Sequence, residues 1–132
     1  MNAKQVAFTI KTSKPVPQAV EALTEALKLK TFGVLSNLNI SKIIKEKTGK
    51  VVDDYVILDI CNAKDADYAL SVHKEIGLIL PCKIIVYKDK NETVISLYRL
   101  TEALKAIGFS DLNAFAEEVE CRLRQAIDSA VA

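Results

Sequence analysis

The segment of the sequence that could carry chemistry runs from Cys61 to Cys82 and holds the chain's one histidine, His73, between them. Thiolate sulfur and imidazole nitrogen are zinc ligands, and a thiol beside a histidine can act as a nucleophile with its base. A structural zinc site takes four protein ligands, however, and the sequence has neither a Cys-x-x-Cys pair nor a second histidine. We predict no metal site within one chain, and we keep as an alternative function a thiol-dependent redox or metal-handling protein that uses Cys61 and Cys82.

The two cysteines lie close together if the strands that hold them are antiparallel neighbours. Directly opposed residues in such strands have Cβ atoms about 4.5–5.5 Å apart. The alternation of side chains points Cys61 away from the apolar core and Cys82 toward it, so a regular ladder separates the sulfurs, and a bulge at Pro81 would reverse this. Because free cysteine is among the most buried residue types, we interpret both as small core residues, with a ligand-binding role as the alternative.

The remaining candidates for chemistry have less support. His73 falls at the edge of an apolar helical face, where most histidines are partly buried structural residues, and it could act as a general base only with a nucleophile within reach. Cys121 lies off the apolar stripe of the last helix, and we interpret it as incidental or partner-facing. The sequence contains no Gly-x-Ser-x-Gly motif, phosphate-binding glycine loop or paired-carboxylate signature. We therefore expect no catalysis and no cofactor.

Changes of hydrophobic period along the chain indicate the elements that position these residues. Period-2 alternation predicts strands, period-3.6 stripes predict helices, and the two apolar runs around residues 88–92 predict a hairpin. We expect Gly33, Gly49, Gly77 and Gly108 to end helices, and Ser41, Asn62 and Ser110 to cap them. The predicted strands are 6–12, 34–40, 55–61, 82–87 and 93–98, and the predicted helices are 16–32, 42–48, 63–76, 100–107 and 110–130. The pattern predicts an α+β fold, a two-layer sandwich of a mainly antiparallel five-stranded sheet with helices on one face.

The strand parity also predicts a sheet face that no helix covers. We assign Val56, Leu58 and Ile60 to the core, so that the alternate residues face outward. The outward set contains tyrosines, which are favoured at interfaces because the ring buries area while the hydroxyl keeps a polar partner. An ordinary solvated antiparallel face is the alternative. The predicted outward set is Thr9, Lys11, Tyr55, Ile57, Asp59, Lys83, Ile85, Tyr87, Ser96 and Tyr98.

Length and composition limit the classes of protein to which the chain can belong. Its 132 residues suit a single domain over residues 1–132, and its 50% apolar and 27% charged residues suit a packed core. The net charge of +1 disfavours nucleic acid and anionic membranes as partners. The sequence shows no secretory signal and no apolar run of membrane-spanning length, and its odd number of cysteines fits reduced thiols, so we expect a cytoplasmic location. We interpret the lysines of residues 42–50 as a solvated helix face.

Several segments together resemble the family catalogued as domain of unknown function 302, over roughly residues 5–127. The resemblance implies a fold similar to the TATA-binding-protein-like class, with the order β-α-β-β-β-β-α plus short helical insertions, and a homodimer; it implies no established activity. The chain departs from the family pattern at Ala63, where proline usually follows Cys-Asn, and at residues 97–100, "LYRL", where a Met-Asp-Pro-like stretch is usual. The matching segments are Gly33–Leu35, Ile44–Gly49, Ile57–Leu70, Glu75–Asp89 and Ala116–Ile127.

We therefore predict a cytoplasmic module that binds a small ligand or a protein partner, forms a homodimer and has no catalysis of its own. This interpretation depends on the tyrosine-bearing face and on the absence of a catalytic motif. The predicted ligand-binding residues are Tyr55, Cys61, Asn62, His73, Cys82, Tyr87 and Tyr98.

Overall fold

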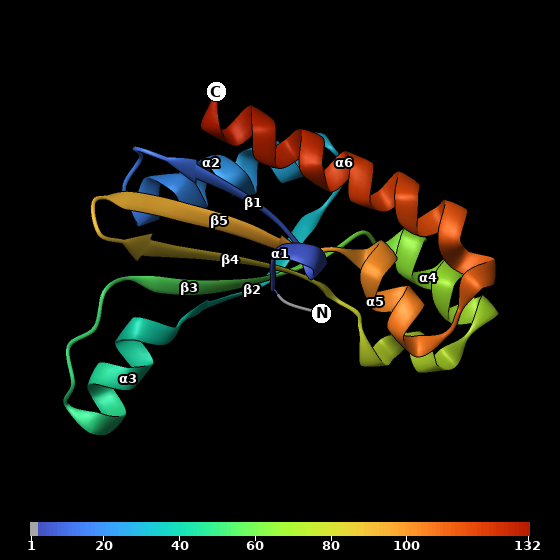
Figure 1. Ribbon diagram of the computed structural model, residues 1–132, viewed down its shortest axis with the longest axis horizontal. Coiled ribbons are helices and arrows are strands. Elements are labelled where there is room, and N and C mark those ends of the chain that lie inside the picture. Colours follow the sequence, from blue (N-terminus) through green and yellow to red (C-terminus); the bar gives the residue numbers. More distant parts are fainter. Residues whose placement is uncertain (1–2) are drawn as a thin grey trace.

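The computed structural model describes residues 3–132, which form a five-stranded sheet with helices packed on it (Figure 1). The order of strands across the sheet is β1-β5-β4-β3-β2, and each neighbouring pair is antiparallel. The α+β class and the two-layer arrangement predicted from the sequence are confirmed. The strands are β1 (Ala7–Thr12), β2 (Gly33–Asn39), β3 (Tyr55–Cys61), β4 (Cys82–Asp89) and β5 (Glu92–Tyr98).

The helices divide into three groups in space. Figure 1 shows α2 and α6 together over one face of the sheet, α4 and α5 beyond one end of it, and α3 projecting on the opposite side from α2 and α6. None of the helices in residues 3–132 combines the length and the apolar character needed to cross a bilayer. The helices are α1 (Ala3–Val6), α2 (Val16–Leu29), α3 (Ile40–Thr48), α4 (Ala63–Val72), α5 (Leu100–Ile107) and α6 (Asn113–Val131), with 3-10 turns η1 (Lys74–Leu78) and η2 (Ser110–Leu112).

The core lies between the sheet and the pair α2 and α6. Along β3 every second residue is fully or almost fully buried, as the alternation in the sequence predicts. Each large side chain of this kind contributes roughly 1.5–3 kcal/mol by its removal from water. The residues that meet here include Val56, Leu58 and Ile60 of β3, Ile84 and Val86 of β4, Ile95 and Leu97 of β5, Leu23 and Leu27 of α2, and Leu123 and Ile127 of α6.

The end of α2 differs from the prediction. Thr31, with φ of 69°, takes the left-handed conformation that we expected at Gly33, and Gly33 is the first residue of β2. The amide of Phe32 donates to the carbonyl of Leu27 at 2.9 Å, which closes the last turn, and the Phe32 ring is buried in the core. Because burial of the Phe32 ring holds Thr31 in the left-handed conformation, the helix ends there without a glycine.

The start of α3 is capped by Asn39, and the prediction of Ser41 is wrong. The Asn39 side chain accepts a hydrogen bond from the amide of Lys42 at 3.0 Å. Strand β2 runs directly into the helix, so the residue at the junction has the extended conformation that a cap requires. Ser41 instead accepts from the amide of Tyr55 at 3.2 Å and thereby ties α3 to β3.

Two further helix boundaries differ from prediction. Helix α4 ends at Val72 and not at residue 76, because His73 is extended, with φ of −140° and ψ of 113°. Gly77 lies inside η1. Ser110 begins η2, and α6 starts at Asn113 without a side-chain cap. The predicted helix ends at Gly49 and Gly108 are confirmed, since both glycines are left-handed.

Candidate functional sites

Cys61 and Cys82 border one small apolar pocket, which we call the cysteine pocket. Cys82 pairs with Ile60, so Cys61 is one residue beyond the ladder between β3 and β4. Cys82 therefore shares the core side of Ile60, whereas Cys61 is the half-buried last residue of β3, where it pairs with Gly33 of β2. The pocket is lined by Phe32, Ile60, Cys61, Asn62, Asp65, Ala66, Leu80, Pro81, Cys82, Leu100, Phe115 and Val119.

The size of the cysteine pocket limits what it can hold. Its volume is about 30 Å³, which has room for one or two water molecules. Pockets that bind small molecules usually measure about 300–1,000 Å³. In this conformation the pocket therefore accommodates at most a small chemical group.

The environment of the two thiols suppresses their reactivity. Both cysteines are free. Burial raises the pKa of Cys82 to about 12, with a smaller contribution from the charge of Cys61. Burial, followed by the negative charge of Asp65, also raises the pKa of Cys61. Since the thiolate is the nucleophile and the metal ligand, both sulfurs are poor nucleophiles at neutral pH.

Asn62 links the cysteine pocket to the end of α2. Its side-chain oxygen accepts from the amide of Asp65 at 3.0 Å and caps α4, as predicted. Its side-chain nitrogen donates to the carbonyl and the hydroxyl oxygen of Thr31 at 2.8 and 2.9 Å. Asn62 therefore stabilises both the start of α4 and the left-handed turn at Thr31.

Arg122 connects the rim of the cysteine pocket to α6. Its guanidinium donates to Asp65 at 2.6 Å and to both carboxylate oxygens of Glu118, and it lies 4.8 Å above the Phe32 ring. These contacts hold α6, α4 and the end of α2 together on one side of the pocket.

His73 lies apart from the cysteine pocket. Its Nε2 is 2.9 Å from each carboxylate oxygen of Asp111, and its ring stacks on Phe109 with 4.0 Å between centroids. The histidine thus clamps the end of α4 to the segment before α6. Within residues 3–132, no three His, Cys, Asp or Glu side chains gather in an arrangement that could hold a metal ion.

The face of the sheet turned away from α2 and α6, which we call the outer sheet face, has two aligned rows of side chains. One row crosses the sheet through Lys11, Val94, Tyr87 and Tyr55, and the other through Thr9, Ser96, Ile85, Ile57 and Leu38. The rings of Tyr55 and Tyr87 stack with centroids 5.3 Å apart. Tyr98 and Leu38 are each 41% exposed, and Ile57 and Ile85 are partly exposed. The predicted outward set is therefore on this face.

Two ion pairs lie within the outer sheet face. Lys83 donates to Asp59 at 3.0 Å, and the Ser36 hydroxyl donates to the other carboxylate oxygen of Asp59 at 2.6 Å. These hydrogen bonds, first from Ser36 and then from Lys83, lower the pKa of Asp59. Lys11 pairs with Glu92 at 3.4 Å.

A second cavity, between α5 and α6, is one that the sequence did not reveal. We call it the polar cleft. Its volume is about 450 Å³. It is lined by Arg99, Thr101, Lys105, Asn113, Glu117, Glu120, Cys121, Arg124, Gln125 and Asp128.

The floor of the polar cleft is built on a buried carboxylate. Glu120 is 5% exposed and accepts from the amide and hydroxyl of Thr101, at 3.3 and 2.8 Å, and from Nε of Arg99 at 3.2 Å. No side chain of α5 caps its own first turn, so Glu120 of α6 satisfies that amide. Two features of the sequence could have indicated this contact. Glu120 lies within the apolar stripe of α6, and α5 has no capping residue at its start.

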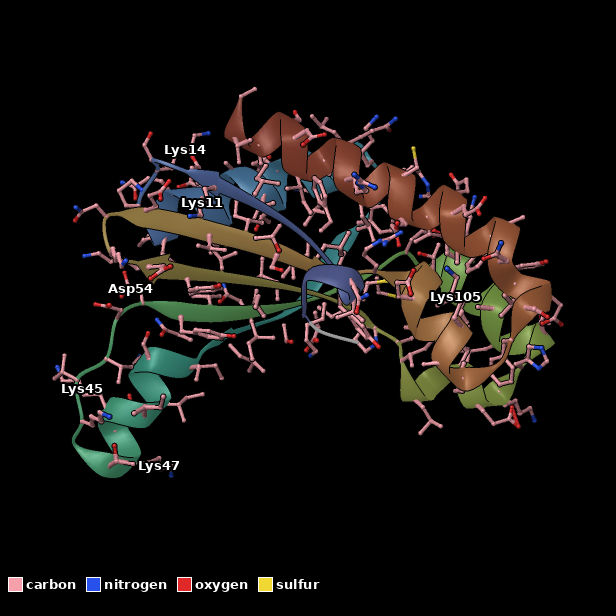
Figure 2. All side chains as sticks on the ribbon, in the orientation of Figure 1. Lys11, Lys14, Lys45, Lys47, Asp54 and Lys105 are labelled. Atoms are coloured by element: carbon pink, nitrogen blue, oxygen red, sulfur yellow. The ribbon has the colours of Figure 1, made fainter. Side chains whose placement is uncertain are left out.

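The cluster of lysines on α3 is solvated as predicted. Lys42, Lys45, Lys47 and Lys50 are all exposed. Figure 2 shows Lys45 and Lys47 on α3, away from the layer formed by α2 and α6. Nothing in the described residues places an aromatic stacking surface among these lysines.

The family model described as domain of unknown function DUF302 matches residues 8–130. The chain belongs to the DUF302 family. It is also similar to a solved structure, the crystal structure of uncharacterized conserved protein DUF302 from Bacillus stearothermophilus, with 29% identity and a TM-score of 0.90, over 95% of this chain and 98% of that one. A search of curated proteins found no match. The family resemblance seen in the sequence is confirmed.

The two positions at which the sequence predicts a departure from the family pattern lie near the two cavities. Ala63 is the exposed first residue of α4, next to Asn62 on the cysteine pocket. Residues 97–100 join β5 to α5, and Arg99 of this stretch pairs with Glu120 under the polar cleft. The stretch of residues 97–100 therefore supplies Arg99 to the lining of the polar cleft.

Proposed function

We propose that this DUF302 protein is a binding module without catalysis of its own, and that it pairs with a second copy through the outer sheet face. The observation that carries the proposal is the uncovered row of Ile57 and Ile85 beside the stacked pair Tyr55 and Tyr87. Large exposed apolar patches on single chains mark interaction sites. Tyrosine suits such a surface because its hydroxyl keeps a polar partner while its ring is buried.

The charge pattern of the outer sheet face favours a second copy as the occupant. In a two-fold contact the same patch meets itself, so an unbalanced charge would meet its like. Here Lys83 is neutralised by Asp59 and Lys11 by Glu92, within the same face. These two lysines therefore bring no unpaired positive charge to a self-contact, and a strongly anionic partner would find no complementary charge on them.

The thiol-dependent alternative has less support. Reactive cysteines are exposed and have a lowered pKa, whereas the pKa values of Cys61 and Cys82 are raised. His73 is bound to Asp111 and stacked on Phe109, outside the cysteine pocket. We further propose that the module is a single domain, works in the cytoplasm, which its free cysteines favour, and does not bind nucleic acid.

Sedimentation equilibrium tests the pairing. We expect the wild-type protein to have the mass of a dimer at micromolar concentration. Ile57→Lys places a charge in the centre of the outer sheet face, so we expect this variant to have the mass of a monomer, with the circular dichroism spectrum of the wild type. If Ile57→Lys fails to fold, Tyr98→Lys tests the same face at a more exposed position.

The matched control is Leu29→Lys, at an apolar residue of α2 that is 84% exposed and lies on another surface. We expect this control to remain dimeric. A monomeric wild-type protein, or a dimer that both Ile57→Lys and Tyr98→Lys leave intact, would refute the proposal.

A further inference from the structure

The polar cleft contains equal numbers of cations and anions. Its three cationic side chains are Arg99, Lys105 and Arg124, and its three carboxylates are Glu117, Glu120 and Asp128. Its volume of about 450 Å³ lies within the range of about 300–1,000 Å³ that is usual for small-molecule sites. A polyanion or a simple cation would meet as much repulsion as attraction here, whereas a molecule that carries both charges would not.

Part of this charge is already used inside the protein. Arg99 and Glu120 neutralise each other at 3.2 Å, and Glu120 is fixed further by Thr101. They form a rigid, preorganised floor, which lowers the cost of ordering the site when a ligand binds.

Two charges on the rim, Arg124 and Asp128, have no partner of opposite sign. The guanidinium of Arg124 lies 4.2 Å from the centroid of the Phe8 ring, a contact that holds it in place without neutralising it. Among the side chains that the structure describes, those of residues 5–132, neither Arg124 nor Asp128 has an ion-pair or hydrogen-bond partner. Lys105 lies opposite on α5, where Figure 2 shows it in the region between α5 and α6. It pairs with Glu102 one turn earlier on α5 at 3.2 Å, and since its side chain is 66% exposed, this surface pair costs little to exchange for a ligand carboxylate.

The spacing along α6 separates the two signs of charge. With a rise of 1.5 Å per residue, Arg124 and Asp128 are roughly 6 Å apart along the helix axis, and Glu117 lies roughly 10 Å before Arg124. A ligand with a carboxylate and an ammonium group a few bonds apart can therefore contact Arg124 and Asp128 together. Arginine is well suited to the carboxylate, which it binds with two parallel hydrogen bonds.

We propose that the polar cleft binds a small zwitterion of dipeptide size, with its carboxylate between Arg124 and Lys105 and its ammonium group on Asp128. This function goes beyond self-association through the outer sheet face. The two surfaces share no residue, since the cleft lies between α5 and α6.

Calorimetric titration with three related probes tests this inference. L-alanyl-L-alanine carries both charges, N-acetyl-L-alanyl-L-alanine lacks the ammonium group, and L-alanyl-L-alanine amide lacks the carboxylate. We expect the zwitterion to bind about tenfold or more tightly than either blocked probe, because each blocked probe loses one charge-assisted contact.

Two variants assign the contacts. Arg124→Gln should weaken binding of the zwitterion about tenfold or more. Asp128→Asn should lower the affinity for the zwitterion to that of the N-acetyl probe, because both changes remove the contact between the ammonium group and Asp128. Lys45→Gln, at an exposed lysine of α3, is the control and should bind as the wild type does.

Alkylation of Cys121 provides a second readout in case the heat of binding is too small to measure. Cys121 lies in the cleft and is exposed, so bound dipeptide should slow its alkylation by N-ethylmaleimide. Equal affinity for the three probes, wild-type affinity in Arg124→Gln, or neither heat nor protection at millimolar dipeptide would each overturn the inference. Ile57→Lys should still bind the dipeptide, because the cleft is separate from the outer sheet face. A failure of dipeptide binding can therefore be distinguished from a failure of self-association.

Discussion

The cysteine pocket and the polar cleft meet at the contact between α5 and α6, yet they have opposite character. Leu100 at the start of α5 and Val119 of α6 border the cysteine pocket. Their immediate neighbours, Thr101 and Glu120, border the polar cleft. One apolar cavity of about 30 Å³ and one polar cavity of about 450 Å³ thus lie on two sides of a single helix contact.

The comparison shows that the surroundings of a residue decide its chemistry. Cys82 is held protonated by burial, whereas Cys121 is exposed in a cleft lined with charges. The cysteines that the sequence makes conspicuous, on either side of the one histidine, are therefore the ones least able to react. The cysteine that looks incidental is the accessible one.

Thiol reactivity should show the largest difference between the two cavities. With Ellman's reagent at neutral pH, we expect one fast phase from Cys121 and slow reaction of Cys61 and Cys82. Because the pKa of Cys82 is about 12 instead of 9.0, its thiolate fraction is lower by roughly a thousandfold. Cys121→Ser should lose the fast phase, and a fast phase that survives in this variant would show that the cysteine pocket opens readily.

Truncation in the wall of the cysteine pocket should cost the most stability. Ile60 is 1% exposed, so Ile60→Ala leaves a void and should lower the free energy of unfolding in urea by about 2–5 kcal/mol. Gln125→Ala, at an exposed residue of the polar cleft, should change it by less than about 0.5 kcal/mol. Similar losses in the two variants would contradict the assignment of one cavity to the core and the other to the surface.

One residue of the polar cleft, Glu120, is buried, so its substitution should lower stability as the substitution of a core residue does. Glu120→Gln keeps the acceptor for Thr101 but presents an amide to Arg99, so we expect the free energy of unfolding to fall by about 1–3 kcal/mol. Glu117→Gln, at an exposed residue of the same cleft, should change it by less than about 0.5 kcal/mol. Equal effects would mean that Glu120 does not stabilise the start of α5.

The sheet could be predicted from the sequence because strand parity is a local property. The burial of Val56, Leu58 and Ile60, the hairpin between β4 and β5, and the outer sheet face all follow from period-2 alternation. The capping of α4 by Asn62 also depends only on neighbouring residues.

The errors arose where a distant contact overrides local preference. Helix α4 ends at Val72, where the ring of the next residue, His73, stacks on Phe109, 36 residues later in the chain. The turn at Thr31 depends on the burial of Phe32, and the polar cleft depends on Glu120 capping a helix to which it is not joined in sequence. Apolar and charged residues alternate in α6 in a way that is typical of any surface helix, so the sequence alone could not place its charges opposite α5.

The smallest expected difference is in the dependence of stability on alkaline pH. The pKa of Cys82 is higher in the folded protein, about 12, than its usual 9.0, so above pH 9 the unfolded chain loses a proton that the folded chain keeps. Stability from this group is complete below pH 9 and is lost as the pH rises toward 12. Between pH 8 and pH 10 the loss should be about 1 kcal/mol.

In Cys82→Ala the free energy of unfolding, measured in urea between pH 8 and pH 10, should no longer show this part of the decrease with pH. We expect this result whatever the substitution does to stability at pH 7. Cys121→Ser, at an exposed thiol of the polar cleft, is the matched control and should keep the slope of the wild type. An unchanged slope in Cys82→Ala would mean that water reaches the cysteine pocket well enough to solvate the thiolate. In that case the contrast between the two cavities would be one of size alone, and the thiol-dependent function would regain support.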